Sequence, residues 1–377
     1  MRTRRLTVVS LAAVLAIGLV ARPALVASAA RSDTLPAKLS GTELWKLIEE
    51  FSEPDGYFRS DNLLSNELWF QWVIPELVQR APQGGVYLGV GPEQNFTYIA
   101  ALKPKMVFIT DVRRGNLHTH LMYKALFELS ADRADFFARL FTKKRPPGLT
   151  AKSTASELVT AYWDSSRTPT GPDSAYKENL EAIKDHLTKT RSLPLGKADL
   201  DGIDYVYSNF YWFGPAITYN SSTSAGGRGG GNMASYGDLM IATDGASVSR
   251  SYLASEESYR FLKDLHERNL VVPLVGNFGG SKALRAIGRY LKERGATVAA
   301  FYLSNVEQYL RQDGLWQMFC GNVASLPLDA RSTFIRSASG GGGGGGGLVN
   351  SLGSMLNETS GCGPASRGPV GSVRISR

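Results

Sequence analysis

The chain has little cysteine and histidine, and what it has is not arranged for a metal. Its 377 residues contain two cysteines, Cys320 and Cys362, and four histidines. Only His118 and His120 lie close together, and no Cys/His spacing typical of a zinc site occurs. Cys362 lies in a Gly/Ser-rich stretch, which argues against a structural disulfide even in a compartment that permits one. The sequence therefore predicts no metal site and no disulfide framework.

The N-terminal region, residues 1–30, lacks acidic side chains and has the layout of a secretory signal peptide. A basic start, MRTRR, precedes an apolar run from Leu6 to Val20. Small residues at Ala27 and Ala29 form the pattern of a cleavage site, so we expect this region to be removed. The alternative is a retained anchor, but the run is shorter than the roughly 20 residues that a membrane span needs. We expect an exported protein, in the periplasm or outside the cell, with no membrane span after cleavage.

Positive charge is too sparse to indicate nucleic acid as a partner. The formal net charge is +8, and four of the arginines lie in the expected signal peptide. The rest of the chain is only mildly basic, whereas nucleic-acid-binding domains usually carry a strong basic patch. We expect a small-molecule ligand or an envelope protein as the partner instead.

Glycine is concentrated near the C-terminus, and this marks the end of the expected folded region. Residues 340–347 are eight consecutive glycines, a run whose ordering entropy burial cannot repay. We predict a disordered tail over 337–377, after a folded domain over 42–336 that follows a loose leader at 31–41. A polar stretch at 142–200, with prolines in its loops, predicts a helical insertion within that domain.

Buried strands alternate with helices through the domain. The expected strands are short apolar runs bounded by glycine, proline or polar residues. They are GGVYLGVG, KMVFITD, GIDYVYSNF, DLMIAT, LVVPLVGNF and TVAAFYLSN. Two N-terminal helices precede them, and later helices such as SEESYRFLKDLHERN, with Ser255 as N-cap, lie between them. The alternation predicts an α/β fold, a doubly wound and mainly parallel sheet.

The stretch VYLGVGPEQN, residues 86–95, is the most informative functional motif. In nucleotide-binding sheets the first strand ends in glycines, and an acid at the end of the second strand accepts the ribose hydroxyls. Gly89 and Gly91 supply the turn here. Asp111 ends the run KMVFITD and follows Gly89 at close to the usual interval of about 20 residues. The spacing predicts a nucleoside site, with a ligand-free scaffold turn as the alternative.

Three departures from the dinucleotide pattern disfavour a pyrophosphate ligand. Gln94 stands where the third glycine belongs, and Pro92 has no N–H to donate. Glu93 would repel a phosphate at the helix N-terminus. S-adenosylmethionine suits the turn better, because it has no phosphate and its amino group can meet Glu93.

The turn can also be compared with the first motif of class I S-adenosylmethionine-dependent methyltransferases, acid-x-Gly-x-Gly-x-Gly. Here Tyr87 stands at the acid position and Glu93 at the third glycine. The chain resembles such a methyltransferase with an altered first motif, and more closely resembles a family of uncharacterised exported bacterial proteins and lipoproteins with a methyltransferase-like fold. The stretches that carry this resemblance are SEPDGYFRSDNLLSNE, GVYLGVGPEQNFTYIAAL, MVFITDVRRGNLHTHLMYKALFE, VPLVGNFGGSKALRAIGRYLKE and FYLSNVEQYL. The resemblance implies a Rossmann-like fold and no established activity.

Ligands of such sheets bind beyond the carboxyl ends of the strands, where polar residues follow each run. The predicted cofactor-binding residues are Gly89, Gly91, Glu93, Gln94, Asn95, Asp111, Arg113, Arg114, Asn277, Asn305 and Glu307. No catalytic residue is assigned, since no G-x-S-x-G elbow occurs and no Ser/His/Asp set can be placed.

Several of these residues also have structural interpretations. Arg113 and Arg114 can hold a carboxylate or phosphate, or can form ion pairs at a surface loop. The turn NFGGSK can bind an anion at a helix N-terminus, or can be a plain connection. Glu307 can be a general acid or base, or the capping-box partner of Ser304. Residues two apart on a helix face different ways, so His118 and His120 cannot act as a matched pair.

Two functions remain open from the sequence. The first is a methyltransferase in which Asp111 holds the ribose and residues 89–95 hold the amino-acid end of S-adenosylmethionine. The second is a non-enzymatic exported protein that uses the fold to bind a ligand or partner. The exported compartment has no ready supply of this cofactor, and the first motif lacks its acid, so we favour the second. An open pocket would support the first, and a turn plugged by Tyr87, Gln94 or Phe96 the second.

Overall fold

A computed structural model describes four parts of the chain. These are residues 33–163, 171–222, 233–339 and 348–362. The expected signal peptide at 1–30 lies outside them, as do the eight consecutive glycines. Within the described parts, no helix is both long enough and apolar enough to cross a membrane.

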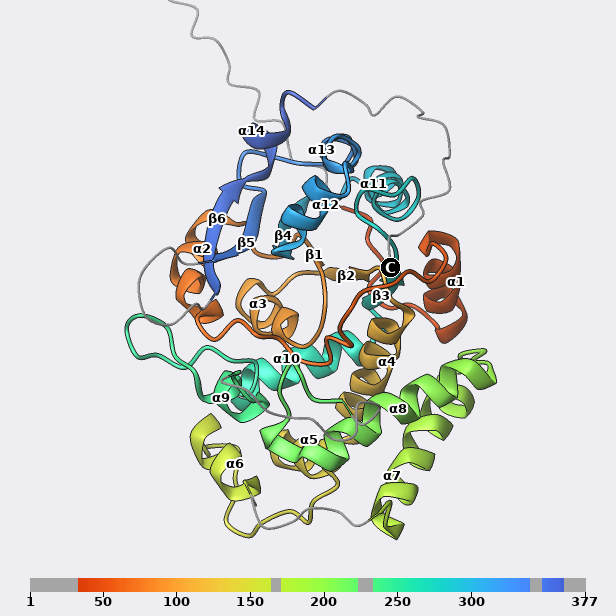
Figure 1. Ribbon diagram of the computed structural model, residues 1–377, viewed down its shortest axis with the longest axis vertical. Coiled ribbons are helices and arrows are strands. Elements are labelled where there is room, and N and C mark those ends of the chain that lie inside the picture. The colour runs from red at the N-terminus through yellow and green to blue at the C-terminus, as the bar shows by residue number, and fades with distance from the viewer. Residues whose placement is uncertain (1–32, 164–170, 223–232, 340–347, 363–377) are drawn as a thin grey trace, which may run out of the picture. The chain divides into compact units, whose positions relative to one another are not determined.

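A six-stranded sheet forms the centre of the fold, in the order β3-β2-β1-β4-β5-β6 (Figure 1). The strands are β1 (Val86–Gly89), β2 (Met106–Asp111), β3 (Val271–Val275), β4 (Val298–Ser304), β5 (Thr333–Ser339) and β6 (Leu348–Ser354). All neighbours pair in parallel except β5 and β6, which are antiparallel. The order reverses between β1 and β4, the switch point at which doubly wound sheets bind ligands. The predicted α/β fold is confirmed.

Helices connect the strands and cover the sheet. The α-helices are α1 (Gly41–Phe51), α2 (Ile74–Arg80), α3 (Gln94–Leu102), α4 (Arg114–Leu129), α5 (Arg133–Leu140), α6 (Ala155–Tyr162), α7 (Ser174–Asp185), α8 (Lys197–Phe213), α9 (Tyr236–Ile241), α10 (Glu256–Glu267), α11 (Ala283–Glu293), α12 (Val306–Gln312), α13 (Trp316–Ala324) and α14 (Met355–Thr359). Three short helices of other types are η1 (Phe70–Val73), η2 (His186–Thr190) and η3 (Gly214–Ala216).

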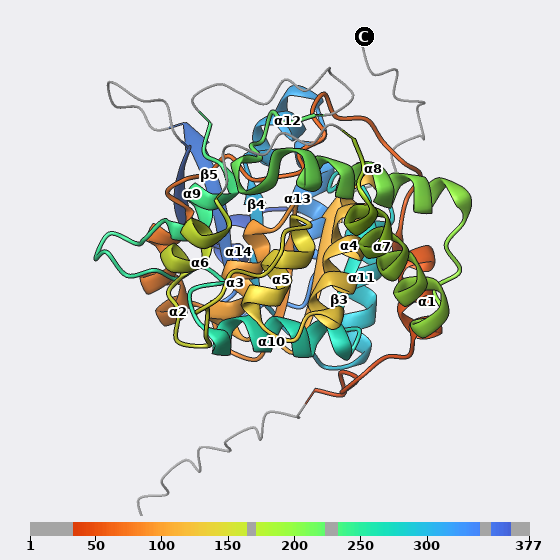
Figure 2. The same ribbon diagram turned by 90° about the horizontal axis from the view of Figure 1, so that it is seen from below.

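The two faces of the sheet are covered by different helices. Helices α3, α4 and α10 pack on one face, and α1, α11 and α13 pack together on the other (Figure 1). Helices α5 to α9 form a further layer outside α4 (Figure 2). Every residue of β1, β2 and β3 is buried, as expected for parallel strands covered on both faces. Each fully buried large apolar side chain contributes about 1.5–3 kcal/mol.

Helix α1 fixes where the following chain enters the sheet. A capping box between Ser40 and Glu43 starts it, and its apolar face is buried. At its end Phe51 stacks on Phe108 of β2 at 6.2 Å and meets Tyr290 of α11 edge-on at 5.7 Å. This packing places residue 52 at the carboxyl end of β3.

Two predicted strands are helices. GIDYVYSNF lies within α8, where Ile203, Val206, Tyr207 and Phe210 are buried at helical spacing. DLMIAT lies largely within α9, which begins with a capping box at Ser235. Their aromatic and β-branched content suits a strand, but packing against other helices decided the outcome, since strand propensity depends strongly on context.

Part of the predicted disordered tail is folded, and the prediction against a disulfide is wrong. Strand β6 pairs with β5 over its full length, and α14 packs on α13. These contacts bring Cys362 to Cys320 of α13, and the two form a disulfide. The composition of the tail does not predict β6, because the apolar residues of this strand are few and follow the eight glycines.

Loss of the disulfide is expected to destabilise the protein. The bond closes a loop with a sequence separation of 42, which in the chain-entropy account corresponds to about 4 kcal/mol. Cys362→Ser should lower the unfolding free energy by this amount, measured by urea titration, and reductant should lower that of the wild type equally. The variant serves as the control, since reductant must not change it further. Equal stability of wild type and variant without reductant would contradict the assignment.

Candidate functional site

The carboxyl edge of the sheet, where the sequence predicts a ligand, is crossed by the chain itself. Residues 52–67, here called the covering segment, connect α1 to the region before η1 and appear in Figure 1 as the red-to-orange chain. The covering segment meets the strand ends in the order β3, β2, β1 and β4, which is their order in the sheet.

At the end of β3, Glu53 fills the turn NFGGSK. Its backbone N–H donates to the carbonyl of Val275 at 2.8 Å. Its carboxylate accepts from the backbone N–H groups of Asn277 at 3.0 Å, Lys282 at 2.9 Å and Ala283 at 3.1 Å. This is the N-terminus of α11, a position that favours anions. The anion there is the chain's own carboxylate.

At the end of β2, the covering segment takes up the groups around Asp111. The N–H of Gly56 donates to the Val112 carbonyl at 2.7 Å, and that of Arg114 to Asp55 Oδ1 at 2.6 Å. Asp111 accepts from the Arg113 N–H at 3.0 Å and lies 3.4 Å from its guanidinium. Arg113 also donates to the carbonyl of Asp61. The two arginines after β2 are thus held by internal partners.

At the end of β1, the glycine turn is plugged by Asn95. Its Nδ2 donates to the carbonyls of Val90 at 2.9 Å and Pro92 at 2.7 Å, and its Oδ1 accepts from the Tyr87 hydroxyl at 2.9 Å. A Cβ at Gly89 would overlap the Asn95 amide. The space that glycine leaves open for a ligand is filled by a side chain of the same turn.

The residues that follow in the turn are buried and contact the covering segment. Gly91 has φ +73°, and a Cβ there would lie 3.4 Å from Asn62. Glu93 is fully buried and accepts from the Ser65 N–H at 3.4 Å. Gln94 accepts from the Ser65 hydroxyl. Neither Glu93 nor Gln94 is accessible to a ligand from solvent.

At the end of β4, Glu67 is the centre of a buried hydrogen-bond network. One carboxylate oxygen accepts from Tyr302 at 2.8 Å and Ser304 at 2.5 Å, and the other from Gln94 and Asn350, both at 2.8 Å. Glu67, Tyr302 and Asn350 are not among the site residues that the sequence predicts. The available signal was a single acid between polar and apolar residues in SNELWF. All four contacts satisfy a carboxylate that would otherwise be costly to bury.

The predicted site residues Asn305 and Glu307 follow β4. Asn305 is the N-cap residue of α12, without a side-chain cap bond, so Glu307 forms no capping box with Ser304. Glu307 instead forms an ion pair with Arg336 of β5 at 2.9 Å. The capping-box interpretation is wrong because Asn305, not Ser304, occupies the N-cap position, and the Ser304 hydroxyl donates to Glu67.

The two neighbouring histidines of α4 face different partners, as expected. His118 and Arg114 both bond Asp199 of α8, at 2.9 and 2.7 Å. Burial opposes ionisation of Asp199, but these two bonds outweigh it and lower its pKa. His120 bonds the carbonyl of Gly91 at 2.8 Å, and burial lowers its pKa to about 4.

A row of buried polar atoms along α4 has no protein partner among the described residues. Asn116, His120 and Tyr123 follow one another on one helix face, and each has a buried atom without a hydrogen bond, as does Glu93. Such groups are commonly satisfied by ordered water. The described residues contain no group of three His, Cys, Asp or Glu side chains that could hold a metal ion.

Helices α3, α4, α11 and α12 begin at the carboxyl edge of the sheet, and carboxylates of the covering segment bond the N-termini of two of them. Glu53 lies at α11 and Asp55 at α4, both bonded to backbone N–H groups. Glu93 precedes α3, and burial raises its pKa to about 8. These positions would otherwise receive the negative groups of a ligand. The edge is therefore closed sterically by residues 87–95 and electrostatically by the covering segment.

Comparison with known proteins gives one family. The model of the family described as Domain of unknown function (DUF7790) matches residues 62–195 and 219–350. The match includes β1 to β5 and the end of the covering segment. No curated protein matches the chain.

The buried Glu93 predicts a specific dependence of stability on pH. Its pKa is about 8 in the folded protein and 4.5 ordinarily, so the folded state holds the proton more tightly. The unfolding free energy should therefore fall as pH rises between these values. Glu93→Gln cannot ionise, so it should remove this fall. Above pH 8 its unfolding free energy should exceed that of the wild type by on the order of 3–5 kcal/mol.

The measurement is urea unfolding of both proteins from pH 5 to pH 9. Glu181→Gln, at an exposed position on α7, is the matched control and should follow the wild type. Parallel curves for wild type and Glu93→Gln would show that Glu93 does not titrate in this range.

Proposed function

We propose that this chain, which belongs to the DUF7790 family, works by binding and not by catalysis, as an exported ligand- or partner-binding protein. It uses a doubly wound sheet as a scaffold. In this proposal the glycine turn of residues 86–95 is a structural connection, and S-adenosylmethionine is not a ligand.

The observation that carries the proposal is the closure of the carboxyl edge. A cofactor in this position would need the space beside Gly89 and Gly91 and the donors at the N-termini of α3, α4 and α11. Asn95 fills the space beside the glycines, and Glu53 and Asp55 accept hydrogen bonds from N–H donors of α11 and α4. Removing Asn95 from the turn would deprive the Tyr87 hydroxyl and the carbonyls of Val90 and Pro92 of this partner, at a cost of about 1–3 kcal/mol for each group left unsatisfied.

Exposed tryptophans next to the covering segment support a binding role. Trp69 and Trp72 are 43% and 53% exposed, and their rings lie 5.2 Å apart. The helix that carries Trp72, η1, packs against the edge strand β6, where Val349 is 51% exposed. Large aromatic side chains in such positions are enriched at protein–protein interfaces.

One observation favours the alternative, a methyltransferase acting on a small molecule or envelope component. Asp111 lies at the end of β2, beside β1, where an acid would hold a ribose. Its carboxylate is bonded to Arg113 alone among the described residues. A cofactor would have to displace the covering segment to reach it.

Titration calorimetry separates the two functions. The chain lacking residues 1–30, but including β6 and Cys362, is titrated with S-adenosylmethionine and with S-adenosylhomocysteine. We expect no saturable heat at roughly millimolar ligand, because the turn is plugged. Micromolar binding to the wild type that Asp111→Ala abolishes would contradict the proposal and support the methyltransferase.

A further inference from the structure

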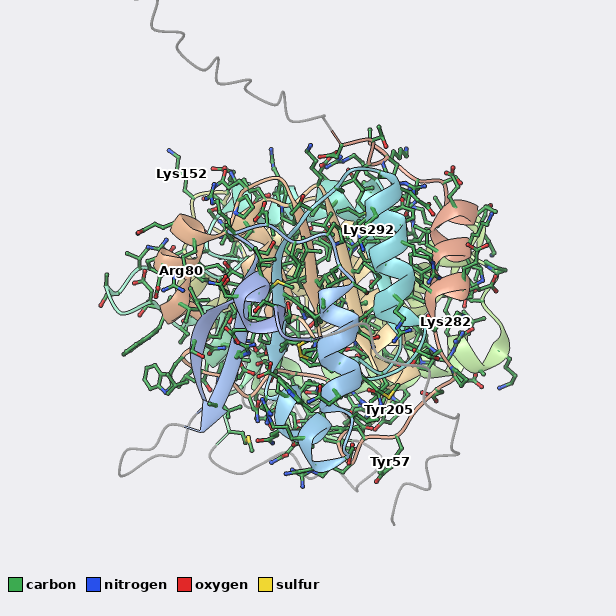
Figure 3. The ribbon with its side chains drawn as sticks, turned by 90° about the horizontal axis from the view of Figure 1, so that it is seen from above. Tyr57, Arg80, Lys152, Tyr205, Lys282 and Lys292 are labelled. Atoms are coloured by element: carbon green, nitrogen blue, oxygen red, sulfur yellow. A yellow bond between two sulfur atoms is a disulfide. The ribbon has the colours of Figure 1, made fainter. Side chains whose placement is uncertain are left out.

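A cavity that is open to solvent on one side lies between α11 and α13, beside the disulfide. Its volume is about 350 Å³, within the usual range for small-ligand sites. Three of its lining residues are cations of α11, namely Arg285, Arg289 and Lys292. No acidic residue is among the described residues that line it. Figure 3 shows Lys292 on α11.

The cations are not neutralised by the described protein. Arg285, Arg289 and Lys292 follow at helical spacing and lie on one face of α11. Among the residues that the structure describes, no carboxylate forms an ion pair with any of them. The neighbouring Arg294 differs from these three cations, because its guanidinium lies over the Tyr290 ring and pairs with Glu293. Like charges at this spacing are mildly destabilising in a helix. An anionic ligand would therefore reduce the repulsion between these cations.

One of the three cations is held in place. The Arg285 guanidinium donates through Nε to Asn322 Oδ1 at 2.7 Å. The Asn322 amide donates in turn to the carbonyls of Phe278 at 2.8 Å and Gly280 at 2.7 Å, which fixes its orientation. Only one of the guanidinium's five N–H groups is used by this bond. The others make no hydrogen bond to the described residues, so a ligand with several acceptor oxygens can use them.

The opposite wall is formed by small residues and by the disulfide. Gly321, Ala324 and Ser325 of the α13 region line the cavity, and Cys362 completes the wall. Cys362 is held there by its bond to Cys320. The shape of the cavity therefore depends on the disulfide.

We propose that this cavity binds a phosphate monoester group. A phosphate carries about −1.5 to −2 charges and three acceptor oxygens, which matches three cations better than a single carboxylate does. Arginine binds such groups through two parallel N–H bonds. The group can belong to a soluble phosphate ester or to a lipid headgroup. This inference rests on the proposed binding function and supplies its ligand.

Calorimetric titration of the chain lacking residues 1–30 tests the site. The probes are inorganic phosphate, glycerol phosphate, and vesicles of phosphatidylcholine with or without phosphatidic acid. We expect saturable binding of at least one phosphate probe at low salt, weakened about tenfold in Arg289→Gln. Cys362→Ser should weaken it as well, because one wall is released. Lys152→Gln, on an exposed loop (Figure 3), is the matched control and should bind like the wild type.

Each outcome of the titration supports or overturns the proposed phosphate site. Binding of the soluble esters identifies a soluble ligand, and binding of phosphatidic acid vesicles alone identifies a headgroup, provided that Arg289→Gln weakens it. No heat with any probe, or equal binding by wild type and Arg289→Gln, overturns the site. That failure leaves the proposed function standing unless S-adenosylmethionine binds in the separate titration, so the two failures are distinguishable.

Discussion

The fold depends on how the backbone N–H groups of the helices that start at the carboxyl edge of the sheet are satisfied. Parallel strands followed by helices direct backbone N–H groups and positive dipole ends to one edge. Enzymes of this architecture place a ligand there. In this chain Glu53 and Asp55 occupy N–H donors of α11 and α4. The covering segment thus supplies the helix N-termini with the negative groups that a bound anion supplies in other proteins.

Closing the edge has consequences for the rest of the molecule. The covering segment must follow the strands in order, and this requires α1 to dock beside β3, with Phe51 packed on Phe108 of β2 and Tyr290 of α11. It also brings Glu67 beside β4 and β6, where four hydrogen bonds hold the carboxylate. The C-terminal hairpin is therefore tied to the N-terminal segment through one buried acid. Any ligand or partner has to use a surface away from this edge.

The sequence predicted the sheet well and the surroundings of the site poorly. Apolar runs with glycine ends are strong signals, and they located β1 to β4 because these strands are buried on both faces. The residues of α8 predict a strand, but packing on neighbouring helices overrides their strand propensity. The sequence predicts Asn95 as a ligand contact, yet the structure shows a side chain that fills its own turn. Periodicity cannot reveal that closure, nor the role of residues 52–67, because both depend on contacts between side chains and backbone groups that no repeat in the sequence marks.

Residues 52–67 close the carboxyl edge of the sheet in the resting protein. Native-state hydrogen exchange of the amides of Gly56, Arg114 and Asn277 tests it most directly, since these N–H groups make the closing bonds. The account predicts slow exchange that S-adenosylhomocysteine leaves unchanged. Fast exchange at these three amides, slowed when S-adenosylhomocysteine is added, would show an open edge that accepts a nucleoside and would contradict the account.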